Sequence, residues 1–127
     1  MDKTTSRRRA RATESLSKAL RAAEAAESKR AENVVVLDLR DLTLVTDYFV
    51  ICTGGSRVQI RAIVDGVDEA MADRAPEVGA RALREGDAEA QWVLIDFGDV
   101  VVHVFGPEAR AFYRLERLWG NARVVAR

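Results

Sequence analysis

The sequence predicts a single α/β domain in which about five β-strands are flanked by helices. Its 127 residues are enough for one domain with a substantial core. Short β-branched runs alternate with longer segments of helical periodicity, which favours a sheet covered by helices. The clearest signal is a hairpin, because the β-rich runs 91–97 and 100–105 are joined by Gly98-Asp99, a pair typical of a tight antiparallel turn.

The chain begins with a polar, basic stretch that precedes a predicted helix. Residues 1–12 carry four arginines between Arg7 and Arg11 and predict a flexible tail. The alternative is a small electrostatic contact with a phosphate backbone. Residues 13–31 are rich in good helix formers. The apolar stripe of this helix is narrow, so we expect the helix to dock weakly.

Two strands and a second helix follow. Residues 33–40 form a β-branched run that predicts a strand buried on both faces, and residues 48–53 predict another. Cys52 in the second run is expected to be a small buried hydrophobe. Gly54-Gly55 ends that strand. Ser56 and Gln59 then have the spacing of a capping box, which predicts the start of an amphipathic helix that reaches about Asp73.

The remaining predicted elements lie on either side of the hairpin. Residues 80–83 predict a short strand, and Glu85-Gly86 predicts the turn that leads to the hairpin. After the hairpin, Pro107 predicts the first turn of a helix that ends at Gly120. The apolar stripe of this helix consists of Phe112, Leu115, Leu118 and Trp119. Residues 121–127 are predicted to be a short tail.

The two faces of the predicted hairpin differ in character. Side chains alternate along a strand, so a two-residue turn fixes which residues share a face. One face is wholly apolar and is predicted to be core; its pairs are Phe97–Val100, Ile95–Val102 and Val93–Val104. The other face is the leading candidate for function; its pairs are Asp96–Val101, Leu94–His103 and Trp92–Phe105.

Composition limits the class of protein. The 20 Lys and Arg residues balance the 20 Asp and Glu residues, which argues against a chain that wraps nucleic acid through bulk positive charge. A protein partner or a local basic patch remains open. Cys52 is the sole cysteine, so no internal disulfide is expected. No apolar run approaches the ~20 residues of a membrane helix, and no secretory signal is recognisable. We therefore expect a cytoplasmic protein that makes no membrane contact.

Motifs for catalysis are weak. Asp96-Phe97-Gly98 matches a protein-kinase tripeptide, but no other kinase signature precedes it. Gly54-Gly55-Ser56 lies where nucleotidyltransferases hold a phosphate, yet the predicted strand 80–83 carries none of the carboxylates that would bind their metal ions. His103 is the only histidine, which excludes a zinc site built on several histidines and cysteines. We expect no enzyme, metal or cofactor; the alternative is a divergent nucleotidyltransferase-like enzyme that uses Gly54 to Ser56 for phosphate.

Four ordered blocks carry a resemblance to a known family. They are Val35 to Arg40, Thr46 to Ser56, Trp92 to Phe105 and Pro107 to Gly120. With these blocks the chain resembles the ribosome silencing factor family, also called the Iojap-related family. The resemblance implies a mixed-sheet α/β domain over about 13–120, similar in shape to nucleotidyltransferases but without their catalytic acids. Phe97 departs from the tyrosine usual in the family, so any hydrogen bond from that hydroxyl is absent here.

The resemblance also implies a function. Such a protein is a translational repressor that binds ribosomal protein L-fourteen on the large ribosomal subunit and sterically blocks joining of the small subunit; members are often homodimers. The expected partner-binding residues are Trp92, Leu94, Asp96, His103 and Phe105, with Tyr48, Asp99, Tyr113 and Trp119 as neighbours. Apolar anchors would provide affinity, and Asp96 or Asp99 would pair with basic groups. A minor contact of the Arg7–Arg11 tail with ribosomal RNA is a further expectation. In a third interpretation, the aromatic face closes on a second copy of the chain.

Overall fold

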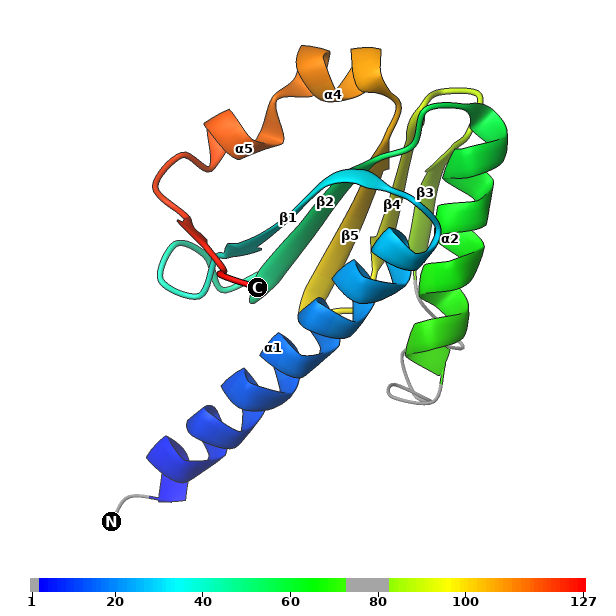
Figure 1. The fold of residues 1–127 in the computed structure, drawn as a ribbon. Helices are drawn as coiled ribbons and strands as arrows, with labels where there is room; N and C mark the ends of the chain where they lie inside the picture. The colour runs from blue at the N-terminus through cyan, green and yellow to red at the C-terminus, as the bar shows by residue number, and fades with distance from the viewer. Residues whose placement is uncertain (1–2, 73–82) are drawn as a thin grey trace.

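The computed structural model of the chain contains one six-stranded mixed sheet with helices on both faces (Figure 1). It describes residues 3–72 and 83–127, with the backbone alone for 3–13 and 83. The strand order is β3-β4-β5-β2-β1-β6. The strands are β1 (Glu32–Asp38), β2 (Tyr48–Thr53), β3 (Leu83–Asp87), β4 (Trp92–Asp96), β5 (Val100–Phe105) and β6 (Arg123–Val124). Only β2 and β5 pair in parallel; the other neighbours are antiparallel.

Four helices are described. They are α1 (Lys3–Ser28), α2 (Arg57–Ala72), α4 (Pro107–Tyr113) and α5 (Leu115–Leu118). The long helices α1 and α2 cover one face of the sheet, whereas the short helices α4 and α5 lie over the other (Figure 1). No helix in the described ranges is long and apolar enough to span a membrane.

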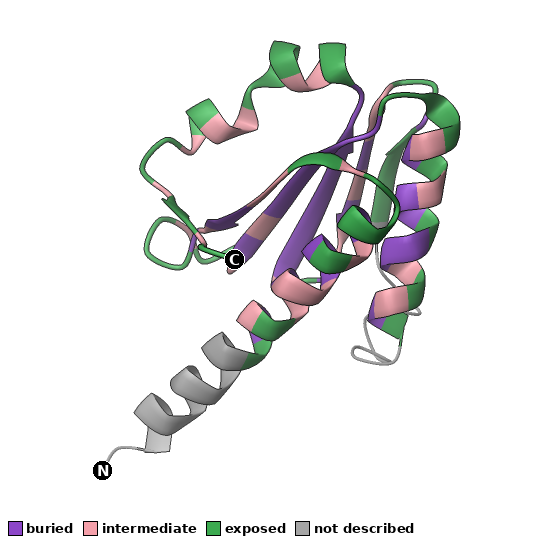
Figure 2. Ribbon diagram, viewed as in Figure 1, coloured by how far each residue is buried: buried purple, intermediate pink, exposed green. Residues whose placement is uncertain are grey.

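The main core lies between the sheet and the two long helices, where the strands are buried (Figure 2). Tyr48, Val50 and Cys52 of β2 point into it, together with Ile60 and Ile63 of α2. The predicted apolar face of the hairpin faces the same core, and its pairs Ile95–Val102 and Val93–Val104 are confirmed. Burial raises the pKa of the Cys52 thiol to about 12, as expected for a buried cysteine with no role as a nucleophile.

The first helix differs from its prediction in length and in docking. It begins at Lys3, not at about Thr13, and ends at Ser28, not at Ala31. It packs closely against the sheet and α2 through fully buried small side chains, among them Ala19, Ala23 and Ser15. The prediction of weak docking was wrong because alanines let the helix backbone approach its neighbours, so a narrow stripe is buried completely. The side chains of Arg7 to Arg11 lie outside the described part, and their contact with ribosomal RNA stays a prediction.

The capping box at the start of α2 is confirmed in a modified form. The backbone N–H of Gln59 donates to the hydroxyl of Ser56 at 3.1 Å. The side-chain carbonyl of Gln59 accepts from the backbone N–H of Gly55 at 2.6 Å, one residue earlier than the usual pattern.

The third strand was predicted too early in the chain. Residues 80–82 lie outside the described ranges, and β3 runs from Leu83 to Asp87. Glu85 and Gly86 are therefore inside a strand, not in a turn; Gly86 has a positive φ of 78°, and the carbonyl oxygen of Trp92 fills the space where a Cβ would lie. The turn instead covers residues 88–91. The carboxylate of Asp87, just before the turn, accepts a hydrogen bond from the backbone N–H of Ala90 at 2.7 Å.

The C-terminal part also differs from prediction. Arg114 adopts a left-handed conformation, with φ of 49°, and divides the predicted helix into α4 and α5. This break changes the apolar stripe: Phe112 and Leu118 are 79% and 73% exposed, whereas Leu115 and Trp119 pack against the sheet. The predicted tail is also wrong, because residues 123–124 form β6 on the free edge of β1. The sheet therefore has a sixth strand.

Candidate functional site

The second face of the hairpin lies beneath α4 and α5 and carries a chain of aromatic rings. We call this surface the aromatic face; it comprises Phe49, Trp92, Leu94, Asp96, Val101, His103, Phe105, Tyr113 and Trp119. Its register is as predicted, with Trp92 opposite Phe105, Leu94 opposite His103 and Asp96 opposite Val101. The residues come from β2, β4, β5, α4 and the end of α5, so strands distant in sequence build one surface.

Ring contacts hold the aromatic face in place. Trp92 stacks on Phe105 with ring centroids 5.1 Å apart, and it also contacts Tyr113 at 4.4 Å. Phe49 contacts His103 and Trp119 edge-on, at 4.6 and 5.9 Å. Phe105 is buried, whereas Trp92 and Trp119 are only partly buried and Tyr113 is exposed. Trp92 therefore packs against the other rings of this layer and also contributes to the exposed surface.

His103 is buried within this layer. The indole Nε1–H of Trp92 donates to its Nδ1 at 3.2 Å. Burial lowers the pKa of His103 from 6.5 to about 4, so the ring is neutral at physiological pH. With Nδ1 as acceptor, the proton of the neutral ring lies on Nε2. Nε2 is buried and has no hydrogen-bond partner among residues 3–72 and 83–127.

A cavity of about 330 Å³ opens on the aromatic face beside this histidine. Phe49, Leu94, Val101 and Trp119 give it mostly apolar walls. The buried hydroxyl of Thr46, which has no partner among the described residues, lies in the same wall as His103. The cavity thus offers mostly apolar contact area, and two buried polar atoms without a described partner belong to residues of its wall.

An exposed apolar loop borders the cavity. Residues 41–47 belong to the connection between β1 and β2, and Val45 lines the cavity while being 85% exposed. Its neighbour Leu44 is fully exposed. Exposed large hydrophobic side chains next to an apolar cavity are typical of a surface that binds another protein.

Asp96 supplies the negative charge of this region. Its carboxylate accepts from the backbone N–H of Gly98 at 2.8 Å, and the residue also lines the cavity. Among the described residues it forms no ion pair, so its charge is available to a basic group of a partner.

Two of the predicted site residues lie elsewhere. Tyr48 is buried on the opposite face of the sheet, in the core beneath α1, because it is adjacent to Phe49 in β2 and side chains alternate. Asp99 also turns towards α1, where its carboxylate accepts from the Ser15 hydroxyl at 2.9 Å and the Lys18 ammonium at 3.2 Å. The structure brings the other seven together: Trp92, Leu94, Asp96, His103, Phe105, Tyr113 and Trp119.

Sequence reasoning missed four members of this region: Thr43, Val45, Thr46 and Phe49. Phe49 pairs with Val101 across the parallel β2–β5 ladder, a contact that a single sequence does not reveal. The apolar residues of loop 41–47 were the available signal for Val45, since a solvated loop has little reason to carry Leu42, Leu44 and Val45.

The predicted alternative site at Gly54–Ser56 is occupied by the chain itself. The Gly55 N–H that a phosphate would need is bonded to the side chain of Gln59. In the parts of the chain that the structure describes, no three His, Cys, Asp or Glu residues gather to hold a metal ion.

Comparison with known proteins extends these observations. Residues 12–127 match the RsfS family, described as "Ribosomal silencing factor during starvation". The chain is 48% identical to ribosomal silencing factor RsfS of Bacillus subtilis over 102 residues, which cover 80% of this chain and 83% of that protein. It is also 39% identical over 112 residues to the chloroplastic protein Iojap of Zea mays, covering 88% of this chain and 47% of that protein.

Two solved structures share the fold. A Chromobacterium violaceum protein superposes with a TM-score of 0.74 at 33% identity, covering 83% of this chain and 85% of its own. A Bacillus halodurans protein superposes with a TM-score of 0.71 at 40% identity, covering 85% and 95%. The range matched by the family, residues 12–127, contains all six strands and the aromatic face. The chain belongs to the RsfS family of ribosomal silencing factors.

Proposed function

We propose that this protein associates with the ribosome and silences translation by binding ribosomal protein L-fourteen on the large subunit, which blocks joining of the small subunit. The observation that carries the proposal is membership of the RsfS family over residues 12–127. The named partner and the steric block come from the resemblance of the four sequence blocks to that family. No turnover is needed, since an occupied surface is sufficient to keep a second subunit away.

The aromatic face has the features that such docking requires. Trp92 and Trp119 offer large, partly exposed rings on the aromatic face, and Trp119 and Val45 line the cavity. Aromatic residues are enriched among the few contacts that dominate binding energy. The mostly apolar cavity beside His103 can receive one side chain of the partner.

The carboxylate of Asp96 should orient the bound partner. Its unpaired carboxylate lines the cavity, so we infer that it faces a Lys or Arg of the ribosomal protein. Charge pairs at the edge of an interface mainly set orientation and association rate, whereas buried anchors set the dissociation rate. Reversing the charge of Asp96 would place like charges together and should weaken binding strongly. The hairpin should stay folded, because the exposed Gly98 N–H that loses its acceptor can bond to water.

Cosedimentation with isolated large subunits tests the proposal. We expect wild type to sediment with the large subunit and Asp96→Lys to remain in the supernatant. Asp65→Lys is the matched control, because Asp65 is an exposed acid on α2, on the other side of the sheet. Direct binding to purified ribosomal protein L-fourteen should give the same ranking. Failure of wild type to bind either the subunit or the purified protein contradicts the proposal.

We also infer that the chain forms homodimers, as the resemblance implies. Light scattering gives the molecular mass in solution. If the aromatic face closed on a second copy, Asp96→Lys would lower that mass and wild-type dimers would not bind the ribosome. If the dimer uses another surface, the mass is unchanged by Asp96→Lys.

A further inference from the structure

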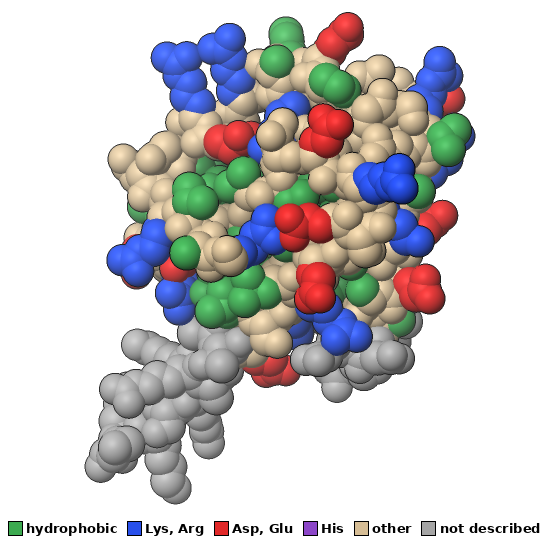
Figure 3. All heavy atoms as spheres, in the orientation of Figure 1, with side chains coloured by type: hydrophobic (Ala, Val, Ile, Leu, Met, Phe, Trp, Pro, Cys, Tyr) green, Lys and Arg blue, Asp and Glu red, His purple; other side chains and the backbone are tan. Residues whose placement is uncertain are grey.

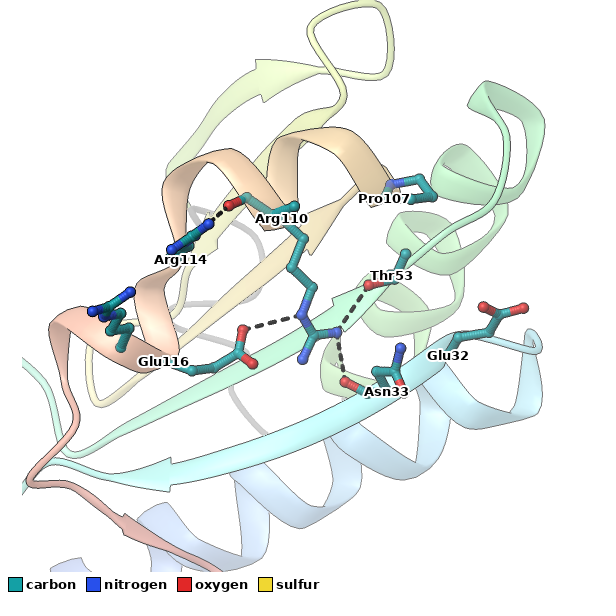
Figure 4. Close-up of a pocket in the computed structure, with 9 residues that line it drawn as sticks. Glu32, Asn33, Thr53, Pro107, Arg110, Arg114 and Glu116 are labelled. Atoms are coloured by element: carbon teal, nitrogen blue, oxygen red, sulfur yellow. Dashed lines mark hydrogen bonds and ion pairs between the residues drawn. The ribbon is translucent and has the colours of Figure 1, made fainter.

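A second cavity, of about 420 Å³, lies at the other end of the α4–α5 layer (Figure 4). It is bordered by the carboxyl end of β2, the start of β1 and both short helices. None of its lining residues belongs to the aromatic face.

The topology of the sheet favours a ligand here. Strands β2 and β5 are adjacent and parallel, so their carboxyl ends meet at one edge. The chain leaves β2 for α2 on one face and leaves β5 for α4 on the other. In open α/β sheets, the crevice at such a divergence is the usual place for a ligand.

Arg110 lines this cavity, and its side chain is only 12% exposed. Its Nη1 donates to the Asn33 carbonyl oxygen at 2.6 Å and to the Thr53 hydroxyl at 2.9 Å, and its Nε donates to Glu116 at 3.0 Å (Figure 4). A guanidinium has five N–H donors. The two on Nη2 have no acceptor among residues 3–72 and 83–127.

The rim adds further positive charge. Arg114 and Arg117 line the cavity and are exposed, whereas Glu32 and Glu116 are the acids in its lining. Three arginines against two glutamates leave one net positive charge in the lining. The positive charge of the lining is not part of a broad basic surface. Positive and negative side chains are interspersed over the side of the molecule shown in Figure 3.

We propose that this cavity binds a phosphate group, carried by a nucleotide or by a nucleic-acid backbone, with Arg110 as its central ligand and Arg114 and Arg117 at its rim. A phosphate has enough peripheral oxygens to accept hydrogen bonds from several guanidinium groups at once. The carboxylate of Glu116 already bonds to the Nε of Arg110, so a ligand would bind to the remaining N–H groups. The volume exceeds that of a phosphate and leaves space for a sugar along Pro107 and Ala111. The carboxylate of Glu116 therefore competes with the phosphate for the guanidinium of Arg110.

The inference is independent of ribosome binding and is tested on the free full-length protein. Arginine side-chain and backbone NMR signals are followed while adenosine 5′-monophosphate, a short oligouridylate RNA or adenosine is added. We expect saturable shifts of the Arg110 Nε–H and the Thr53 amide with both phosphate-bearing probes and none with adenosine. The tighter of the two probes identifies the source of the phosphate.

Three variants decide whether the cavity is responsible. Arg114→Ala combined with Arg117→Ala should weaken binding about tenfold, since two charge-assisted contacts are lost. Glu116→Gln should strengthen it about threefold by removing the competing carboxylate. Arg57→Ala on α2 is the matched control and should change nothing. Equal shifts at Arg57 and Arg110, no saturable shift at Arg110 with either phosphate probe, or unchanged affinity in Glu116→Gln would each overturn the proposal.

Discussion

The indole of Trp92 donates a hydrogen bond of 3.2 Å to Nδ1 of His103 across the β4–β5 ladder. This bond joins the partly exposed ring of the aromatic face to a histidine that is only 3% exposed. It fixes the neutral tautomer of His103 with its proton on Nε2. The surface and its buried support are therefore one unit, and changes at Trp92 should affect both stability and binding.

Substitution of Trp92 separates these two effects. Trp92→Phe keeps ring packing against Phe105 but leaves Nδ1 of His103 without its donor, so the free energy of unfolding should fall by about 1 kcal/mol. Trp92→Ala also removes the ring and should cost about 2–3 kcal/mol. Urea unfolding followed by circular dichroism measures both. Equal stability of Trp92→Phe and wild type would show that the hydrogen bond contributes nothing.

His103 predicts a pH dependence of stability. Burial lowers its pKa from 6.5 to about 4, so between these values the unfolded chain binds a proton that the folded chain does not. The contribution to the free energy of unfolding is therefore fully present above about pH 6.5 and is lost as the pH falls to about 4, by about 3 kcal/mol in total.

The free energy of unfolding is measured for wild type and His103→Gln across this pH range. The difference between the two proteins isolates the effect of the histidine from that of carboxylates that titrate in the same range. The wild type should lose more stability than the variant on going from pH 7 to about pH 4. Identical pH profiles for the two proteins would contradict a buried neutral His103.

The alanines of α1 predict sensitivity to side-chain size. Ala23 is fully buried where α1 packs, so Ala23→Leu should lower the free energy of unfolding by about 1–3 kcal/mol. Glu24→Leu places the same side chain on the exposed neighbouring position and should change stability by less than about 0.5 kcal/mol. Thermal or urea unfolding gives the comparison, and similar values for the two variants would argue against close docking of α1.

Asp96 and Asp99 should behave differently although both lie at the hairpin turn. Asp99→Asn removes the ion pair with Lys18 and should reduce stability by about 1 kcal/mol without weakening ribosome binding. Asp96→Asn keeps an acceptor for the Gly98 N–H and should weaken binding while leaving stability unchanged. Unfolding and cosedimentation are measured on both variants. The reverse pattern would place Asp99, not Asp96, at the interface.

The hairpin was predictable because its determinants are local. A two-residue turn with glycine and the strict alternation of β4 and β5 fix the register, so both faces follow from the sequence. The helix α2 was predictable for the same reason, since its cap and its apolar period lie within one segment.

Features that depend on distant partners were not predictable. Gly86 was predicted to lie in a turn, but it lies in a strand where the absence of a side chain lets the backbone of Trp92 in the neighbouring strand come close. Arg114 adopts a left-handed conformation that its residue type does not favour. The parallel β2–β5 pairing determines which of Tyr48 and Phe49 joins the aromatic face. The family resemblance and the α/β class, in contrast, needed only the ordered sequence blocks and are confirmed.

Subunit joining measured by light scattering tests the central claim most directly. Purified large subunits are incubated with the protein before small subunits are added. We predict that wild type and Asp65→Lys reduce the joined fraction in proportion to the large subunits that they occupy, and that Asp96→Lys does not. Large subunits that carry bound wild-type protein and still join small subunits at the normal rate would contradict the steric block.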